Sequence, residues 1–481
     1  GGVNTAMGYR ALKSNTTASN NVAIGYASLC SNTTGTENTA VGTNSQDSTT
    51  TGNYNSSFGF CSLQKNTSGG YNTAIGYKTL FKNNASLNTA VGWSALLCND
   101  SGSNNVAVGV NSLEKNTTAS NNVAVGYESL ACNTTGTQNV ATGTCSLKSN
   151  TTGSNSSAFG FCALASGTTA NLNTAIGNFA LKTTQTGCRN TAVGYQSMFD
   201  ATSAECNTAL GAYSLANNTT ADNNTALGTC SLFTNTTGAE NTAVGQQALC
   251  GNSTGNYNTA VGSFALLDVD AGADNNTAVG RSSMITLSTG DGNTAIGSQS
   301  LRSATTPSHN TAIGFCSLYN NTTGAENTSI GFNAGCQNTT GSNNSMIGNF
   351  AQSSSATVSN EFTLGNPNNN NLRCADTSIS SLSDLRDKTN IEDIPHGLDF
   401  INALRPVKFD WKARDGSRVG KKDYGFIAQE LDKVETDFDS AEYTRLVHKE
   451  NPDKLEADPM KTYPILIKAI QELTARVKEL E

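Results

Sequence analysis

A 17-residue unit recurs from the first residues of the chain to about residue 365. Its five-residue anchor, of the type Asn-Thr-Ala-Val-Gly, occurs 22 times, first at Asn4 and last at Glu361. All steps between copies are 17 residues except one of 16 and one of 18. Self-similarity at one short period is typical of a solenoid, in which each unit buries its apolar side on its neighbours. We therefore expect residues 1–365 to form a rod.

Positions within the unit are counted from the anchor Asn, which is position 0. Position +4 is Gly in all 22 copies, which predicts a positive φ or a close backbone approach there. Position +2 is almost always Ala, +3 is usually Val, Ile or Leu, and +8 is usually Leu. Two short apolar stretches separated by Gly, followed by an Asn-Thr-Thr-Gly turn, fit one rung of a parallel β-roll or β-helix.

The core of such a rung is thin. Neighbouring rungs would lie about 4.8 Å apart, and each would bury about one Leu, one Val or Ile and two Ala. Ordering 17 residues costs roughly 20 kcal/mol or more, so further burial between chains is expected. An aromatic residue often stands at +5, where it could stack along the rod or pack between chains.

The repeat resembles the short head repeats of trimeric autotransporter adhesins, whose Val-Ala-Ile-Gly core is matched by Val22, Ala23, Ile24 and Gly25. The resemblance implies a trimeric, left-handed parallel β-roll. The many Asn-x-Thr sequences could be glycosylation sites, but an Asn/Thr ladder that stabilises the repeated turns is the favoured interpretation. Regular Thr and Asn arrays also occur on ice-binding solenoids, which are a rival for the rod alone.

Charge divides the chain into two regions. Residues 1–370 contain 11 of the 29 Lys and Arg and 15 of the 37 Asp and Glu, and the rest lie in residues 371–481. We expect a linker at residues 366–382 and a separate domain at residues 383–481. The rod has no basic patch, so nucleic acid is not an expected partner, and no apolar run is long enough to insert into a membrane as a helix. The repeat is already running at Gly1, so a longer parent protein is expected.

Four motifs near the C-terminus, at residues 380–388, 398–407, 424–430 and 463–473, occur in the order found in another family. Together they resemble the intramolecular chaperone domain at the end of phage endosialidases and tail fibres, also classed as peptidase S74. The resemblance implies a small α+β domain that trimerises the chain and then cuts itself off. It places the cut at the family signature Ser-Asp-x-Arg-x-Lys.

The resemblance also assigns the site residues. The bond between Leu382 and Ser383 is cut, Ser383 is the nucleophile, Lys388 is its base, and Asp384 and Arg386 support them. A serine hydroxyl needs a neighbouring base, and a lysine can act as one where burial or nearby cations lower its pKa. Arg386 could supply that field or bind the developing oxyanion. This would be a single-turnover serine autoprotease with a Ser-Lys dyad. No cofactor or metal site is expected.

The last segment, about 462–481, predicts a helix with an apolar stripe at coiled-coil spacing. The stripe comprises Ile467, Ile470, Leu473, Val477 and Leu480. The expected fold is therefore mainly β: a trimeric parallel β-solenoid shaft followed by a small α+β chaperone domain that ends in a coiled-coil helix.

The expected function is that of a homotrimeric viral tail fibre or spike on the virion. It would be assembled in the host cytoplasm and would bind a host-cell surface receptor, with a glycan as one candidate. A cellular trimeric surface adhesin and an ice-binding solenoid are the alternatives, and neither accounts for the last 100 residues.

Overall fold

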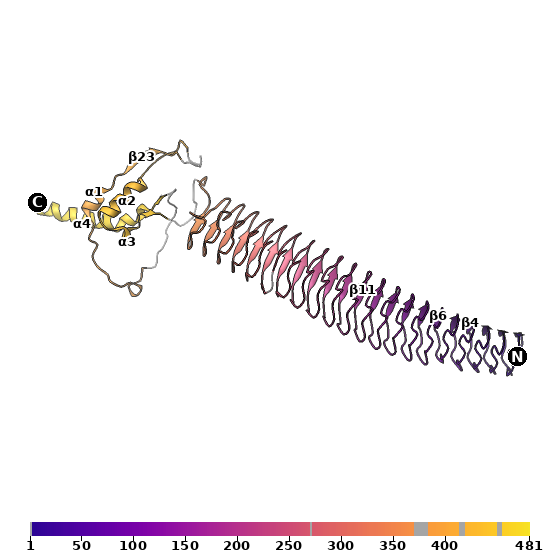
Figure 1. The fold of residues 1–481 in the computed structure, drawn as a ribbon. Coiled ribbons are helices and arrows are strands. Elements are labelled where there is room, and N and C mark those ends of the chain that lie inside the picture. Colours follow the sequence, from indigo (N-terminus) through magenta and orange to yellow (C-terminus); the bar gives the residue numbers. More distant parts are fainter. Residues whose placement is uncertain (1, 270–271, 370–382, 413–418, 450–454) are drawn as a thin grey trace. The chain divides into compact units, whose positions relative to one another are not determined.

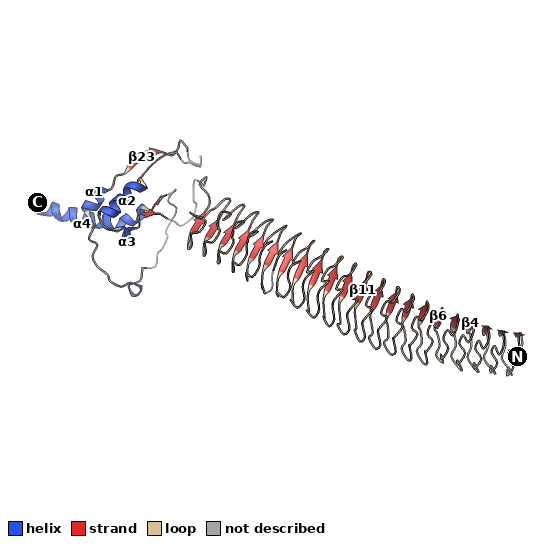
Figure 2. Cartoon of the chain, viewed as in Figure 1, coloured by secondary structure: helices blue, strands red, loops and turns tan. Residues whose placement is uncertain are grey.

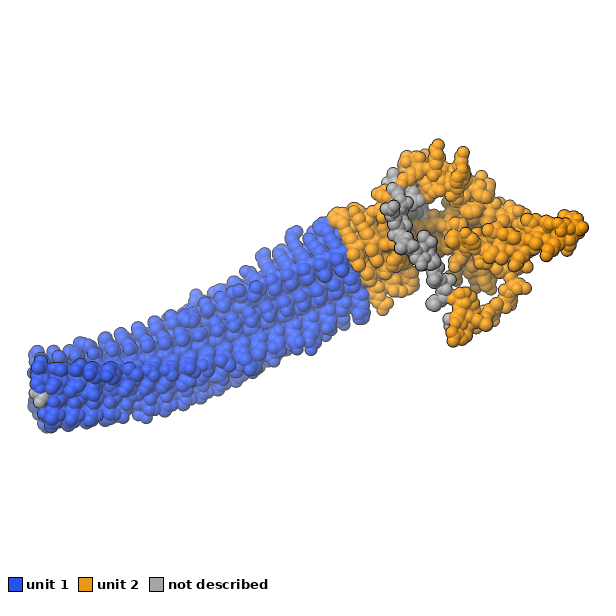
Figure 3. Space-filling view, turned by 180° about the vertical axis from the view of Figure 1, so that it is seen from behind, with its two compact units in different colours: residues 1–323 blue, residues 324–481 orange. Residues whose placement is uncertain are grey.

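The computed structural model describes residues 2–269, 272–369, 383–412, 419–449 and 455–481. The chain divides into two compact units, unit 1 (Gly1–Thr323) and unit 2 (Gly324–Glu481) (Figure 3). This division falls within the repeat, before the change in charge near residue 370. The predicted boundaries of the linker at 366–382 remain a prediction.

Unit 1 is a parallel β-solenoid of 17-residue rungs, as predicted. Each rung contributes one three-residue strand, and neighbouring strands pair in parallel with like positions opposite each other, for example Ala107 with Ala124. The strands lie one above another along one side of the rod, and the loops return along the other (Figures 1 and 2). The strands of unit 1 are β1 (Thr5–Met7), β2 (Val22–Ile24), β3 (Thr39–Val41), β4 (Ser56–Phe58), β5 (Thr73–Ile75), β6 (Thr89–Val91), β7 (Val106–Val108), β8 (Val123–Val125), β9 (Val140–Thr142), β10 (Ser157–Phe159), β11 (Thr174–Ile176), β12 (Thr191–Val193), β13 (Thr208–Leu210), β14 (Thr225–Leu227), β15 (Thr242–Val244), β16 (Thr259–Val261), β17 (Thr277–Val279), β18 (Thr294–Ile296) and β19 (Thr311–Ile313).

The two irregular steps leave the strand ladder intact. The 16-residue step keeps Ala74 opposite Ala90, and the 18-residue step keeps Ala260 opposite Ala278. Because the strands stay in register, the missing and the extra residue are both absorbed in the loops between them.

The interior of the rod differs from the expected one at position +3. Ala at +2 and Leu at +8 are buried as expected, for example Ala124 and Leu130. The +3 side chain instead points outward, because successive residues of a strand face opposite sides and +2 already faces inward. Val125 is 36% exposed and Ile176 is 41% exposed. Part of the expected apolar core is therefore replaced by buried polar residues.

Two columns of buried Asn residues, at positions 0 and +11 of the repeat, form this polar part of the interior. The backbone N–H of Asn122 donates to Oδ1 of Asn105, one rung away, at 3.0 Å, and its Nδ2 donates to the carbonyl of Gly136 at 3.0 Å. The second column, at +11, includes Asn133, whose Nδ2 donates to the same carbonyl at 2.9 Å. The hydrogen-bonded groups of these columns avoid the cost of desolvation and link the turns of neighbouring rungs, although Oδ1 of some +11 residues, such as Asn150, is buried without a partner.

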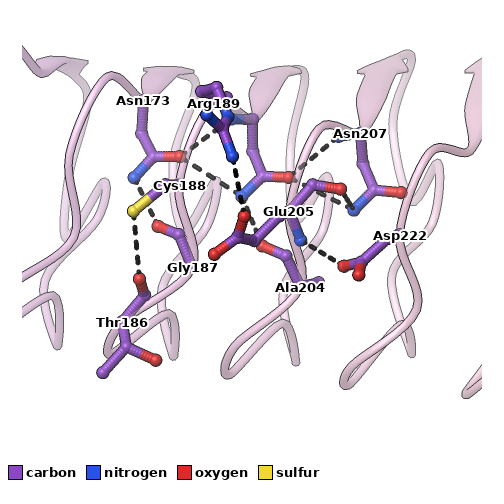
Figure 4. Close-up of polar contacts among 10 residues, drawn as sticks. Asn173, Thr186, Gly187, Cys188, Arg189, Ala204, Glu205, Asn207 and Asp222 are labelled. Carbon is purple, nitrogen blue, oxygen red and sulfur yellow. Dashed lines mark hydrogen bonds and ion pairs between the residues drawn. The ribbon is translucent and has the colours of Figure 1, made fainter.

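Figure 4 shows the first column in the middle of the rod, where Asn173 donates from Nδ2 to the carbonyl of Gly187 at 2.8 Å. An ion pair between Arg189 and Glu205, with Nη2 and Oε2 3.0 Å apart, lies on the surface beside it. The pair joins two rungs but is largely exposed, and exposed pairs contribute little stability.

The turn that contains the Asn-x-Thr sequences is part of the ladder. Asn116 is buried, and its Nδ2 donates to Oδ1 of Asn99 at 2.7 Å and to the carbonyl of Ala119 at 3.0 Å. The hydroxyl of Thr134 donates to the carbonyl of Thr151, one rung away, at 2.9 Å. The Asn nitrogen that a glycan would occupy is thus bonded within the rod, and so is the hydroxyl of the Thr that directly follows the Asn, as the ladder interpretation predicts.

The invariant Gly at +4 has both predicted properties. Gly126 has a φ of +136°, and a Cβ placed on it would lie 2.6 Å from the carbonyl oxygen of Gly143 in the next rung. Positive φ is strained for residues with a side chain, and the close approach would remain even if the strain were tolerated. Glycine is therefore required at this corner for two independent reasons.

One rung carries a polar exception to the core pattern. Gln46 stands at +8 in place of Leu and is fully buried. Ser57 stands at +2 of the next rung in place of Ala, and Nε2 of Gln46 donates to its hydroxyl at 2.8 Å. Oε1 of Gln46 is buried without a hydrogen-bond partner. A buried unsatisfied group costs about 1–3 kcal/mol.

This pair leads to a testable expectation. We expect Gln46→Leu combined with Ser57→Ala to stabilise this rung by about 1–3 kcal/mol, because the unsatisfied oxygen is removed and the regular core is restored. Ser57→Ala alone should destabilise it, because Gln46 then loses a partner. Amide hydrogen exchange of the rungs around β4 measures both effects. Additive single and double variants would show that the two residues are not coupled.

Unit 2 contains the last three strands of the repeat and a small α+β region. The repeat strands are β20 (Thr328–Ile330), β21 (Ser345–Ile347) and β22 (Phe362–Leu364), which pair in parallel. The remaining elements are η1 (Leu385–Asp387), α1 (Leu398–Ala403), β23 (Val407–Asp410), β24 (Lys422–Gly425), α2 (Ala428–Asp437), α3 (Ala441–Thr444), β25 (Val447–His448), β26 (Glu456–Ala457), η2 (Pro459–Thr462) and α4 (Tyr463–Leu480). The predicted C-terminal helix over about 462–481 is present as α4.

The α+β region has its own apolar core. Buried side chains from α1, α2, the segment around β25 and α4 meet in it: Phe400, Leu431, Leu446, Val447 and Ile465. Strands β23 and β24 form an antiparallel hairpin, and β25 pairs with β26 in the same sense. This core gathers three of the four C-terminal motifs into one folded body.

Candidate active site

The signature segment Ser383–Lys388 folds into a tight turn around η1. The side chain of Asp384 accepts a hydrogen bond at Oδ1 from the backbone N–H of Arg386 at 2.9 Å, which starts the turn as an N-cap does. The backbone N–H of Lys388 donates to the carbonyl of Leu385 at 3.2 Å and closes it. The turn thereby brings Lys388, five residues further along the chain, close to Ser383.

This turn brings the predicted nucleophile and base together. Nζ of Lys388 lies 2.6 Å from Oγ of Ser383, within hydrogen-bonding distance. In a Ser-Lys dyad the hydroxyl must be able to pass its proton directly to the amine, and this distance allows that transfer. Both side chains are exposed in the single chain, so water reaches the dyad freely.

The two predicted supporting residues contact each other. Arg386 donates to Asp384 through Nε at 3.0 Å and through Nη2 at 2.6 Å, a bidentate geometry that fixes both planes. Hydrogen bonds from this guanidinium, and then from the backbone N–H, lower the pKa of Asp384 below its usual value, so it is ionised at neutral pH. The same contact raises the pKa of Arg386. We call this bidentate pair the Asp384–Arg386 clamp, because it links two residues of the turn.

The predicted cleaved bond is only partly within the described residues. Ser383 is described, whereas Leu382 lies outside the described residues. The structure thus defines the dyad and the clamp, but the position of the carbonyl that the dyad would attack is not part of it.

Other contacts connect the remaining motifs to one another. Arg405, after α1, donates from Nε to Oε2 of Glu430 in α2 at 2.9 Å, which joins the second motif to the third. Glu472 of α4 accepts at Oε2 from the backbone N–H of Leu398 at 2.8 Å and so holds the start of α1. Sequence reasoning did not single out Glu472. The only available signal was its place on α4 away from the apolar stripe.

Helix α4 has two different apolar faces. Ile465 and Ala469 are buried in the core of unit 2. The five residues of the predicted coiled-coil stripe are exposed in the single chain, by 48–88%: Ile467, Ile470, Leu473, Val477 and Leu480. The stripe is therefore not used to pack α4 onto its own domain.

Within the described parts of the chain, no helix has the length and apolarity needed to cross a bilayer. Over the same residues, no group of three or more His, Cys, Asp and Glu side chains is arranged to hold a metal ion.

Comparison with known proteins supports the C-terminal assignment. Residues 383–441 match the family described as "Chaperone of endosialidase", peptidase S74. The match begins at Ser383, covers η1 through the start of α3, and includes the signature Ser383–Lys388 followed by the second and third motifs. A search of curated proteins found no match to the chain. The resemblance inferred from the C-terminal motifs is thus confirmed for this segment, and α4 lies beyond it.

Proposed function

We propose that the chain is a fibre or spike protein whose C-terminal domain assembles three copies and then releases itself by cutting the bond between Leu382 and Ser383. The observation that carries this proposal is the 2.6 Å contact between Ser383 and Lys388 at the first residue of the family match. The rod would be the durable product, and it would serve on a virion as a shaft that reaches a host-cell surface receptor.

The chemistry of the cut follows from the position of Ser383. Its Oγ attacks the carbonyl carbon of Leu382 while Lys388 accepts the hydroxyl proton. The acyl group passes from the nitrogen of Ser383 to its oxygen, and the nitrogen leaves as an amine after it receives a proton. Water then hydrolyses the ester, which leaves a carboxylate on Leu382 and a free N-terminus on Ser383. The Asp384–Arg386 clamp keeps the turn in the shape that joins Ser383 to Lys388.

Assembly into a trimer is supported by the family match and by α4. The matched family, described as "Chaperone of endosialidase", supports trimerisation, and the exposed stripe on α4 has the spacing of a coiled-coil seam. A lysine acts as a base more readily in a site shielded from water. Because the dyad is exposed in the single chain, we infer that association shields it, so that cleavage follows assembly.

The order of events can be tested through the α4 stripe. We expect Ile470→Lys with Leu473→Lys to give a monomer that stays uncut, because charges placed in the seam prevent the helices from associating. The control Gln471→Lys, an exposed position between them, should trimerise and be cut as the wild type is. Light scattering combined with intact mass reports both properties. A monomeric variant that is cut at the wild-type rate would separate cleavage from assembly and contradict the proposed order.

A further inference from the structure

The outer face of the strand ladder carries a column of exposed apolar side chains along unit 1. Eleven of the nineteen +3 residues of this unit are 36–60% exposed: Met7, Phe58, Ile75, Val108, Val125, Phe159, Ile176, Leu210, Leu227, Val261 and Ile296. Together the +3 side chains expose on the order of 1,000 Å², whereas the largest apolar patch on a soluble monomer is about 300–600 Å². A stable interface takes about 800 Å² from each partner, so this face is large enough to be one.

The side chains on this face vary in size but are nearly always apolar at +3. Phe occurs twice at +3 in unit 1, in β4 and β10. In the other strands of unit 1 this residue is Val, Ile, Leu or Met, except for Thr142 in β9. Eighteen of the nineteen strands thus present an apolar side chain at +3, as a contact between identical parallel rods would require.

We propose that this outer strand face, made of the +1 and +3 side chains of β1–β19, is the surface through which copies of this chain pack side by side along the shaft. The partner that packs on this face is a second copy of the same rod, aligned in parallel. This inference rests on the proposed assembly of three chains and specifies which face of the shaft is used.

Two pairs of phenylalanines offer an internal comparison. Phe58 and Phe60 lie in the same rung, before and after the Gly59 corner, and are 42% and 44% exposed in the single chain. Phe159 and Phe161 repeat this arrangement at 40% and 45%. Within each pair the residue type and exposure match, and only the position relative to the strand differs.

Hydroxyl-radical footprinting of the full-length protein, read by mass spectrometry, tests the proposal after the oligomer mass has been measured. We expect Phe58 and Phe159 to be oxidised on the order of tenfold more slowly than Phe60 and Phe161 in the trimer, because the core of an interface excludes water. Equal oxidation within the pairs, whether fast or slow, would overturn the assignment of this face while leaving trimerisation intact. A monomeric protein would instead overturn the proposed assembly, and this inference with it.

A pair of substitutions tests the same interface without oxidative labelling. Val108 at +3 and Val110 at +5 share one rung and are 37% and 40% exposed. We expect the shaft of Val108→Lys to dissociate into single chains at a temperature at which the wild-type and Val110→Lys shafts remain trimeric. Identical melting of the two variants would argue against the strand face as the interface. Circular dichroism of both at low temperature shows whether each rod has folded.

Discussion

Ser383→Ala is expected to leave a single full-length chain of 49.9 kDa, with no separate fragment that starts at residue 383. Alanine has no hydroxyl to attack the preceding carbonyl, so the acyl shift cannot begin. Lys388→Ala should slow cleavage by about 10²–10⁴-fold, which is the usual contribution of a general base. Lys388→Arg should be nearly as slow, because a guanidinium does not give up its proton in proteins. Intact mass spectrometry over time after expression measures all three rates.

The same series separates cutting from assembly. Each of these variants should still form trimers, because the α4 stripe and the unit 2 core do not include Ser383 or Lys388. Thr389→Ala, which removes the hydroxyl next to the lysine, is the matched control and should be cut normally. If Ser383→Ala were cut as fast as the wild type, the proposed mechanism would be wrong. If it failed to trimerise, the turn would have a structural role that the exposed geometry does not indicate.

Gly126→Ala is expected to disrupt the rod locally. The methyl group would lie 2.6 Å from a carbonyl oxygen of the next rung, on a backbone with φ of +136°. Strain at such a φ costs about 1–3 kcal/mol, and overpacking typically adds about 1–3 kcal/mol. Amide hydrogen exchange should show faster opening of β8, β9 and their neighbours, while distant rungs stay protected, because each rung of a solenoid contacts only its neighbours.

Gly167→Ala provides the matched control for this effect. A Cβ at Gly167 would come no closer than 3.4 Å to the atoms around it, and its φ does not lie in the region that favours glycine. We expect this variant to exchange like the wild type or slightly more slowly, because alanine reduces the entropy of the unfolded chain. Equal disruption by the two substitutions would show that the close approach at the +4 corner does not limit stability.

The period and the invariant Gly allowed the solenoid to be predicted from the sequence, because a repeat of this length must stack on itself and a corner of this kind requires glycine. That prediction placed the +3 side chain inside the rod, which was wrong. Hydrophobicity suggested that Val125 lies inside, but in a three-residue strand only the middle residue faces the core. The sequence pattern cannot distinguish an apolar side chain that packs on its own chain from one that is available to another.

The local backbone conformation was the other feature that could not be predicted from the sequence. Leu130 has a φ of +51°, a left-handed conformation that is uncommon for leucine, and the same occurs at most +8 positions. Burial of this side chain in the rung offsets the strain, and no local propensity would have predicted it. At the candidate active site, the family resemblance predicted Ser383 and Lys388, and the structure places the two side chains in contact. Their contact accompanies the Asp384 turn, in which Arg386 is paired with Asp384.

The two irregular steps show how the shaft could change in length over evolution. One rung more or less alters the rod by about 4.8 Å, and the ladder stays in register even where a loop has gained or lost a single residue, as at Ala74–Ala90 and Ala260–Ala278. Duplication or deletion of whole units would therefore change the reach of the shaft in discrete steps without a new fold. The number of rungs, which sets the length of the shaft, can thus change without a change in the fold of each rung.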